Sequence, residues 1–226
     1  MSYIEKVHGI REEIDAIAHA RGGDARGVQI IAISKTHDAD TIQKAINEGI
    51  RLFGENRIQE ARAKIPLLKG EFGFHLVGHL QSNKARDAVA LFELIHSIDK
   101  HGTAVMVDTE ARKIDKVQKV LVQVNTSGED SKSGVRPDDA IALCRAVREL
   151  PSVDLRGLMT IGPLTGDEDR VRASFRMLAE ILTKTNAALG TDMQELSMGM
   201  SSDYRIAVEE GATMVRIGTA IFGTRD

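Results

Sequence analysis

Short apolar runs recur along the chain, and each has the length of a strand that is buried on both faces. Segments with helical periodicity separate many of these runs, with apolar residues spaced three and four positions apart. We predict eight strands, at residues 29–34, 52–54, 74–77, 94–98, 120–124, 155–161, 195–198 and 214–217. The clearest helices between them are predicted at residues 40–48, 56–68, 137–150, 167–189 and 202–210.

A further helix is predicted ahead of the first strand. Its apolar residues follow the helical period, with charged residues between them, at Ile4, Val7, Ile10, Ile14 and Ile17. The glycine pair within residues 21–24 is expected to end this helix.

The order of these elements favours an α/β fold. Alternating strands and helices form a parallel sheet, and 226 residues are about the length that eight strand–helix units need in a compact (β/α)8 TIM barrel. No shift in composition marks a domain boundary, so residues 1–226 are predicted to form a single barrel domain with the extra N-terminal helix. A doubly wound open sheet is the alternative fold.

Composition narrows the classes of function. Lys and Arg number 30 against 33 Asp and Glu, and a net charge of −3 lacks the basic excess that nucleic-acid binding needs. The single cysteine, Cys144, excludes an intramolecular disulfide framework and a multi-thiolate metal site. The sequence shows no secretory signal and no apolar stretch of about 18 residues, so we expect a cytoplasmic protein without a membrane partner.

Lys35 is the sharpest candidate for chemistry. It follows the apolar run at residues 30–33, and functional residues of a TIM barrel cluster at the carboxyl ends of its strands. A lysine partly desolvated at the barrel mouth can act as an amine nucleophile that forms a Schiff base with an aldehyde. The alternative is a strand-terminal lysine that points to water.

The loops after the last two predicted strands suggest a phosphate site. Ser201 and Ser202 precede a predicted helix, whose free N–H groups favour an anion. Gly218 and Thr219 follow the eighth strand, where a bare glycine backbone lets an anion approach the amides. Ordinary turn chemistry explains both loops equally well.

Other polar groups give weaker signals. His75 and His79 lie four residues apart, but a strand orients them differently from a helical metal pair, so no metal site is predicted. Residues 128–134 form a small-residue loop that lacks the Gly-Lys-Ser/Thr order of a nucleotide-binding loop.

Five motifs occur in an order that closely resembles the YggS/PROSC family of pyridoxal 5′-phosphate (PLP) homeostasis proteins. The resemblance extends from about Ile30 to the C-terminus, and residues 126–134 keep the family's Ser-Lys-x-Gly core with small variations. The motifs are Ser34-Lys35-Thr36, FGENRIQE at 53–60, HLVGHLQSNK at 75–84, LSMGMSSD at 196–203 and VRIGTAIFG at 215–223.

The resemblance implies a barrel like the N-terminal domain of bacterial alanine racemase, with PLP held as an internal aldimine on Lys35. It also implies that Arg216 faces the pyridine nitrogen of the cofactor. Lys35 would follow the first strand and a phosphate loop would follow the last. Because these two strands are neighbours in a closed barrel, the lysine and the phosphate loop are expected to lie close together.

The same resemblance implies the remaining cofactor contacts. Ser201, Gly218 and Thr219 would hold the phosphate, and Asn56 and Met198 would lie against the cofactor.

These residues predict a PLP carrier or reservoir in cofactor homeostasis, with no efficient catalysis. An arginine keeps its proton and leaves the pyridine nitrogen unprotonated, which weakens the cofactor as an electron sink. Racemases of this architecture take a tyrosine base from a second domain, whereas this chain ends at Asp226 and contains only Tyr3 and Tyr204. The alternatives are a PLP-dependent amino-acid racemase and a Schiff-base aldolase that acts without PLP. We expect a monomer, with apo forms of PLP-dependent enzymes as recipients.

Overall fold

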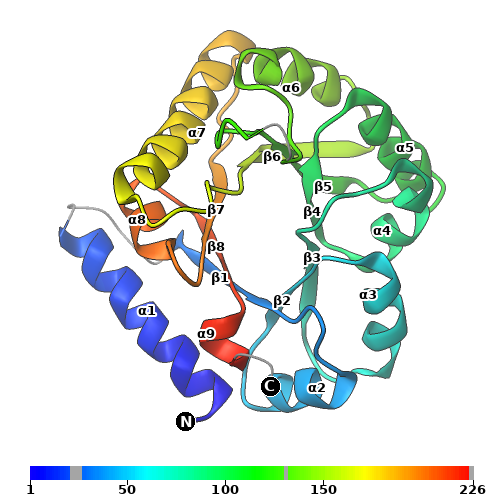
Figure 1. The fold of residues 1–226 in the computed structure, drawn as a ribbon. Coiled ribbons are helices and arrows are strands. Elements are labelled where there is room, and N and C mark those ends of the chain that lie inside the picture. Colours follow the sequence, from blue (N-terminus) through cyan, green and yellow to red (C-terminus); the bar gives the residue numbers. More distant parts are fainter. Residues whose placement is uncertain (21–26, 130–131, 224–226) are drawn as a thin grey trace.

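The computed structural model describes residues 1–20, 27–129 and 132–223, and the chain forms a closed barrel of parallel strands surrounded by helices (Figure 1). The strands follow one another around the barrel in sequence order. They are β1 (Gln29–Ile33), β2 (Leu52–Glu55), β3 (Gly73–Leu76), β4 (Leu94–Ile98), β5 (Gln118–Gln123), β6 (Val153–Met159), β7 (Glu195–Met200) and β8 (Met214–Ile217). The predicted TIM barrel is confirmed, and the open sheet is wrong.

Helices precede, separate and follow the strands, and they cover the outside of the barrel. They are α1 (Tyr3–Ala20), α2 (Ala39–Asn47), α3 (Ile58–Lys64), α4 (Ala85–Leu91), α5 (His101–Arg112), α6 (Ala140–Arg148), α7 (Glu168–Leu189), α8 (Tyr204–Glu209) and α9 (Thr219–Phe222). Short 3₁₀ turns precede or follow some of them, at η2 (Ile65–Leu67), η3 (Ser82–Lys84) and η4 (Pro137–Asp139). The helix predicted at 56–68 is shorter because Pro66 in η2 has no N–H group to continue the α-helical ladder.

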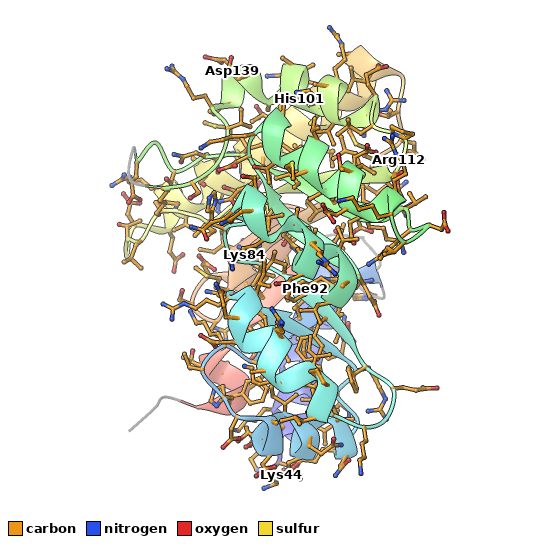
Figure 2. The ribbon with its side chains drawn as sticks, turned by 90° about the vertical axis from the view of Figure 1, so that its right-hand side faces the viewer. Lys44, Lys84, Phe92, His101, Arg112 and Asp139 are labelled. Carbon is orange, nitrogen blue, oxygen red and sulfur yellow. The ribbon has the colours of Figure 1, made fainter. Side chains whose placement is uncertain are left out.

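The helices run from the end of the barrel where the strands finish, here called the mouth, to the opposite end. Figure 2 shows this from the side: α4 extends from near Lys84 to Phe92, and α5 runs beside it from His101 to Arg112. Within the described ranges, no helix combines the length and apolar character needed to cross a membrane.

The barrel closes through parallel pairing of β1 with β8, in which Gln29 faces Met214 and Ile31 faces Arg216. This pairing places the turn after β1 next to the turn after β8, although these segments lie near opposite ends of the sequence. The candidate lysine and the candidate phosphate loop therefore meet at one side of the mouth.

The extra helix α1 lies outside the barrel against α8 and α9 (Figure 1). Ile10 and Ile14 of α1 are buried, and the Glu13 carboxylate accepts hydrogen bonds from Tyr204 and Arg205. The N-terminal helix is thus present as predicted, while its expected stop at residues 21–24 lies outside the described residues.

Alternation along the strands separates two apolar layers. Outward-facing residues pack with the helices in the large outer cluster, which includes Ala32 and Phe53. Inward-facing residues form a smaller inner cluster, which includes Ile31 and Ile33. Because side chains alternate along a strand, the next inward position after Ile33 is Lys35.

Candidate functional site

A cavity of about 400 Å³ opens at the mouth of the barrel. This volume lies within the roughly 300–1,000 Å³ of typical small-molecule sites. Its walls come from most of the strand ends, at Ile33, Lys35, Asn56, Val77, Gly78, His79, Gln123, Lys132, Ser133, Ile161, Met200 and Arg216. Three of the predicted cofactor contacts, Lys35, Asn56 and Arg216, therefore share one cavity.

Lys35 lines this cavity with its amine unbonded. Its side chain is exposed, so the partial desolvation expected from the sequence is not provided by the protein. Within the described residues, the Lys35 ammonium takes part in no hydrogen bond and no ion pair. It is therefore available to a ligand that enters the mouth.

Arg216 is a nearly buried cation that lines the same cavity from β8, the strand next to β1, with 5% of its surface exposed. It donates from Nη1 to Ser197 Oγ at 2.7 Å and from Nη2 to the Thr160 carbonyl oxygen at 2.7 Å. Burial lowers the pKa of Arg216 to about 10, and the charge of nearby Asp203 opposes that shift. The guanidinium stays protonated near neutral pH, so it presents a fixed donor to the cavity.

Behind Arg216, a chain of hydrogen bonds crosses the inside of the barrel. Ser197 Oγ lies 2.8 Å from His96 Nδ1, and His96 Nε2 lies 3.0 Å from His75 Nδ1. Ser197 Oγ, which accepts from Arg216, is thus linked through His96 to His75. The chain thereby holds the orientation of Arg216.

Both histidines in this chain are held neutral. Burial lowers the pKa of His75 to about 4 and the pKa of His96 well below 6.5. His96 and Ser197 were not identified from the sequence as parts of the site. The available signal was a polar residue at an inward position of an apolar strand.

Ser201, Gly218 and Thr219 come together just beyond Met200 and Arg216. The Ser201 hydroxyl oxygen accepts from the Gly218 amide at 3.2 Å and from the Ala220 amide at 3.5 Å. This contact ties the loop after β7 to the first turn of α9, where main-chain N–H groups lack helical partners. The two candidate phosphate loops therefore form one cluster of donors beside the cavity.

Met198 is placed differently from the expectation. Its side chain is fully buried in the outer cluster and does not line the cavity. Met200 lines the cavity instead, because the β7–β8 register shifts between Ser197 and Met200 and Gly199 adopts a φ of +91°. A Cβ at Gly199 would lie 2.6 Å from Ala207 Cβ, so this break in alternation depends on glycine.

The weaker candidates from the sequence, which are the two histidines and the loop at 126–134, form no metal site among the described residues. His75 lies inside the barrel whereas His79 lines the mouth cavity, and no group of metal-ligating residues occurs in the described part of the chain. The loop at 126–134 is described except for residues 130 and 131, and its Lys132 reaches the Gly162 carbonyl at 2.8 Å.

The chain matches the family model described as alanine racemase, N-terminal domain, over residues 9–226. A pyridoxal phosphate homeostasis protein of Aquifex aeolicus is 37% identical over 226 residues, which cover 100% of this chain and 99% of the relative. The structure of PipY from Synechococcus elongatus with PLP bound has a TM-score of 0.82 and 38% identity, and covers 93% of this chain and 100% of PipY.

An alanine racemase of Clostridium difficile shares the fold with a TM-score of 0.76 at 12% identity. The similarity covers 95% of this chain but only 55% of the racemase. The chain belongs to the family of pyridoxal phosphate homeostasis proteins, which is built on the alanine racemase N-terminal domain.

Proposed function

We propose that this protein binds PLP reversibly in the mouth cavity and acts as a carrier or reservoir in cofactor homeostasis. The observation that carries the proposal is the presence, in one cavity, of a buried arginine, Arg216, and a lysine, Lys35, whose amine has no partner among the described residues. The similarity to PipY, whose structure contains PLP, supports the same ligand.

The residues present fit the chemical groups of PLP. Lys35 offers an amine to the aldehyde, and Arg216 offers a donor to the pyridine nitrogen. The Ser201 hydroxyl proton and the Thr219 amide offer neutral donors to the phosphate, and Gly218, whose amide donates to Ser201 Oγ, leaves room beside them because it has no side chain. Bound PLP would supply an aldehyde and an aromatic ring for reversible attachment to Lys35.

Asn56 and a methionine complete the proposed contacts with the ring. Asn56 lines the cavity from the end of β2. Met200 rather than Met198 provides the methionine side chain, since Met198 faces the outer helices.

Efficient catalysis does not fit this arrangement. Arg216 leaves the pyridine nitrogen unprotonated, which weakens carbanion stabilisation. Neither tyrosine lines the cavity: Tyr204 donates to Glu13, and burial raises the pKa of Tyr204 to about 12, while Tyr3 packs on Phe222 with ring centroids 5.3 Å apart. The racemase alternative therefore lacks its tyrosine base in the described part of the chain.

We further propose that the protein works in the cytoplasm as a monomer and delivers PLP to apo forms of PLP-dependent enzymes. The open mouth, with Lys35 exposed, supports exchange of the cofactor with partners. Size-exclusion chromatography with light scattering tests the monomer.

The central experiment compares the absorbance of purified wild type with that of Lys35→Ala after PLP addition. We expect the visible imine absorbance to vanish completely in Lys35→Ala and to persist in Lys84→Ala, a matched lysine substitution on the adjacent side of the mouth. Borohydride reduction followed by mass mapping should place the modification on Lys35. An unchanged spectrum in Lys35→Ala would contradict the assignment.

The same preparation separates the alternatives. A racemase would turn over alanine or serine faster than PLP in buffer does. A Schiff-base aldolase without PLP would remain colourless after PLP addition. We expect neither result.

A further inference from the structure

The turn that carries Lys35 has a strained backbone. Thr36 has a φ of +68°, a left-handed conformation that is costly for a β-branched residue. The turn is closed by the His37 amide, which donates to the Ser34 carbonyl at 3.1 Å. Such strain persists only where surrounding contacts hold it.

Lys64 of α3 supplies the strongest of these contacts. Its ammonium donates to the Ser34 carbonyl at 3.2 Å, to the His37 carbonyl at 3.0 Å and to Glu55 Oε1 at 2.6 Å. Lys64 therefore bonds both ends of the Lys35 turn. An ammonium has only three protons to donate, so Lys64 is saturated and does not compete with Lys35 for an aldehyde.

Glu55 anchors Lys64 from the end of β2. Its carboxylate is fully buried, and Oε1 also accepts from the Ser34 hydroxyl at 2.7 Å. The second oxygen, Oε2, has no hydrogen-bond partner among the residues that the structure describes. Burial raises the pKa of Glu55, although its hydrogen bonds to Lys64 and Ser34 oppose that shift.

A second acidic residue of α3 completes the support of the turn. The amide of Thr36 donates to Glu60 Oε2 at 3.0 Å, and the same oxygen lies 3.9 Å from Lys64 Nζ. Residues of β2 and α3 thus hold the main chain on either side of Lys35, while no described residue bonds its side chain.

We propose that Lys64, paired with Glu55, is a positioning residue that holds the Lys35 amine in place for imine formation. The inference rests on the proposed binding of PLP. In the step concerned, the neutral Lys35 nitrogen attacks the aldehyde carbon and a C=N bond replaces C=O. The carbonyl oxygen leaves as one water molecule with the two amine hydrogens. Lys64 touches neither reacting atom and acts only through the main chain of the turn.

The test uses the double variant Glu55→Gln/Lys64→Met, because Lys64→Met alone would leave a buried unpaired carboxylate. Stopped-flow absorbance at saturating PLP gives the first-order rate of imine formation. We expect the double variant to form the imine at least about tenfold more slowly than wild type. Calorimetry should show unchanged affinity for pyridoxamine 5′-phosphate, which has no aldehyde and makes no bond to Lys35.

Lys116→Met is the matched control. The Lys116 ammonium also bridges two main-chain carbonyls, those of Val89 at 2.6 Å and Phe92 at 2.8 Å, but at the end of the barrel opposite the mouth. We expect this variant to lose stability and to form the imine at the wild-type rate. The comparison of this control with the double variant distinguishes a general loss of packing from a loss of the position of the Lys35 amine.

Glu60→Ala keeps the inference testable if the double variant does not fold. It removes the acceptor of the Thr36 amide together with the ion pairs of Glu60 to Lys64 and Arg57, but it leaves the bonds of Lys64 to the turn in place. We expect slower imine formation by a smaller factor, again with unchanged pyridoxamine 5′-phosphate affinity. A wild-type rate in both variants, or an equal slowing in Lys116→Met, would overturn the positioning role alone. Failure of the wild type to form any imine would overturn the proposed function itself.

Discussion

The outer and inner layers of this barrel are packed by different chemistry. Between strands and helices lies one large apolar cluster, which contains the fully buried Phe53 and Phe175. Inside the barrel, a smaller apolar cluster shares the space with the chain from Arg216 through Ser197 and His96 to His75. The comparison indicates that the outer layer provides most of the stability, whereas the inner layer trades stability for an oriented cation at the cavity.

The largest expected effect comes from breaking the outer layer far from the mouth. Phe92 is 1% exposed and lies at the end of α4 opposite the mouth (Figure 2). Phe92→Ala should lower the free energy of unfolding by about 3–5 kcal/mol, as measured by urea denaturation. Imine absorbance per folded molecule should stay at the wild-type level. A selective loss of PLP binding would contradict the assignment of stability to the outer layer and of binding to the inner layer.

An intermediate effect should follow from acid, through the inner layer. Unfolded histidines titrate near 6.5, whereas burial holds the pKa of His75 at about 4. Between these values the unfolded chain binds more protons, so stability is present above pH 6.5 and is lost as pH falls towards 4. His75 alone should account for about 2 kcal/mol between pH 7 and pH 5.

Urea denaturation at the two pH values measures this loss. His75→Gln should reduce the change in the free energy of unfolding between pH 7 and pH 5. The control His101→Gln, at an exposed position at the start of α5, should leave this change as it is in the wild type. An identical slope in wild type and His75→Gln would show that the inner layer does not carry the acid sensitivity.

The smallest effect concerns binding rather than folding. Arg216→Met removes the buried cation, and we expect PLP affinity to fall by about 1.5 kcal/mol, or roughly tenfold, with little change in stability. Arg51→Met is the control, because Arg51 also donates to main-chain carbonyls, those of Ile46 and Ile50, at the end opposite the mouth. Titration calorimetry of both variants checks the difference, and equal affinities would remove Arg216 from the proposed contacts.

Much of the outer layer was predictable because its apolar pattern repeats in many strands and helices, although the helices α4, α5 and α9 were not predicted. Apolar residues at helical spacing gave α7 to within one residue, with Asp167 as its N-cap. The Lys35 position was also predictable, since it follows a buried strand directly. Boundaries changed where proline interrupts the hydrogen-bond ladder, as in η2 with Pro66.

The inner layer was less predictable because each of its polar residues stands alone in an apolar run. His96 lies between Ile95 and Ser97, and nothing local shows that it meets Ser197, which lies on a distant strand. Met200 lines the cavity in place of the expected Met198 because Gly199 adopts a left-handed conformation. The alternation of side chains along a strand does not reveal this conformation. Contacts between strands, rather than patterns within them, decide these features.

The pairing of β1 with β8 also orders events during synthesis. Lys35 leaves the ribosome early, but Arg216 lies on the last strand and Gly218 follows it. One wall of the cavity is therefore missing until β8 has been made and has docked beside β1. If PLP binds in this cavity as proposed, its site is complete only when the whole barrel has been made.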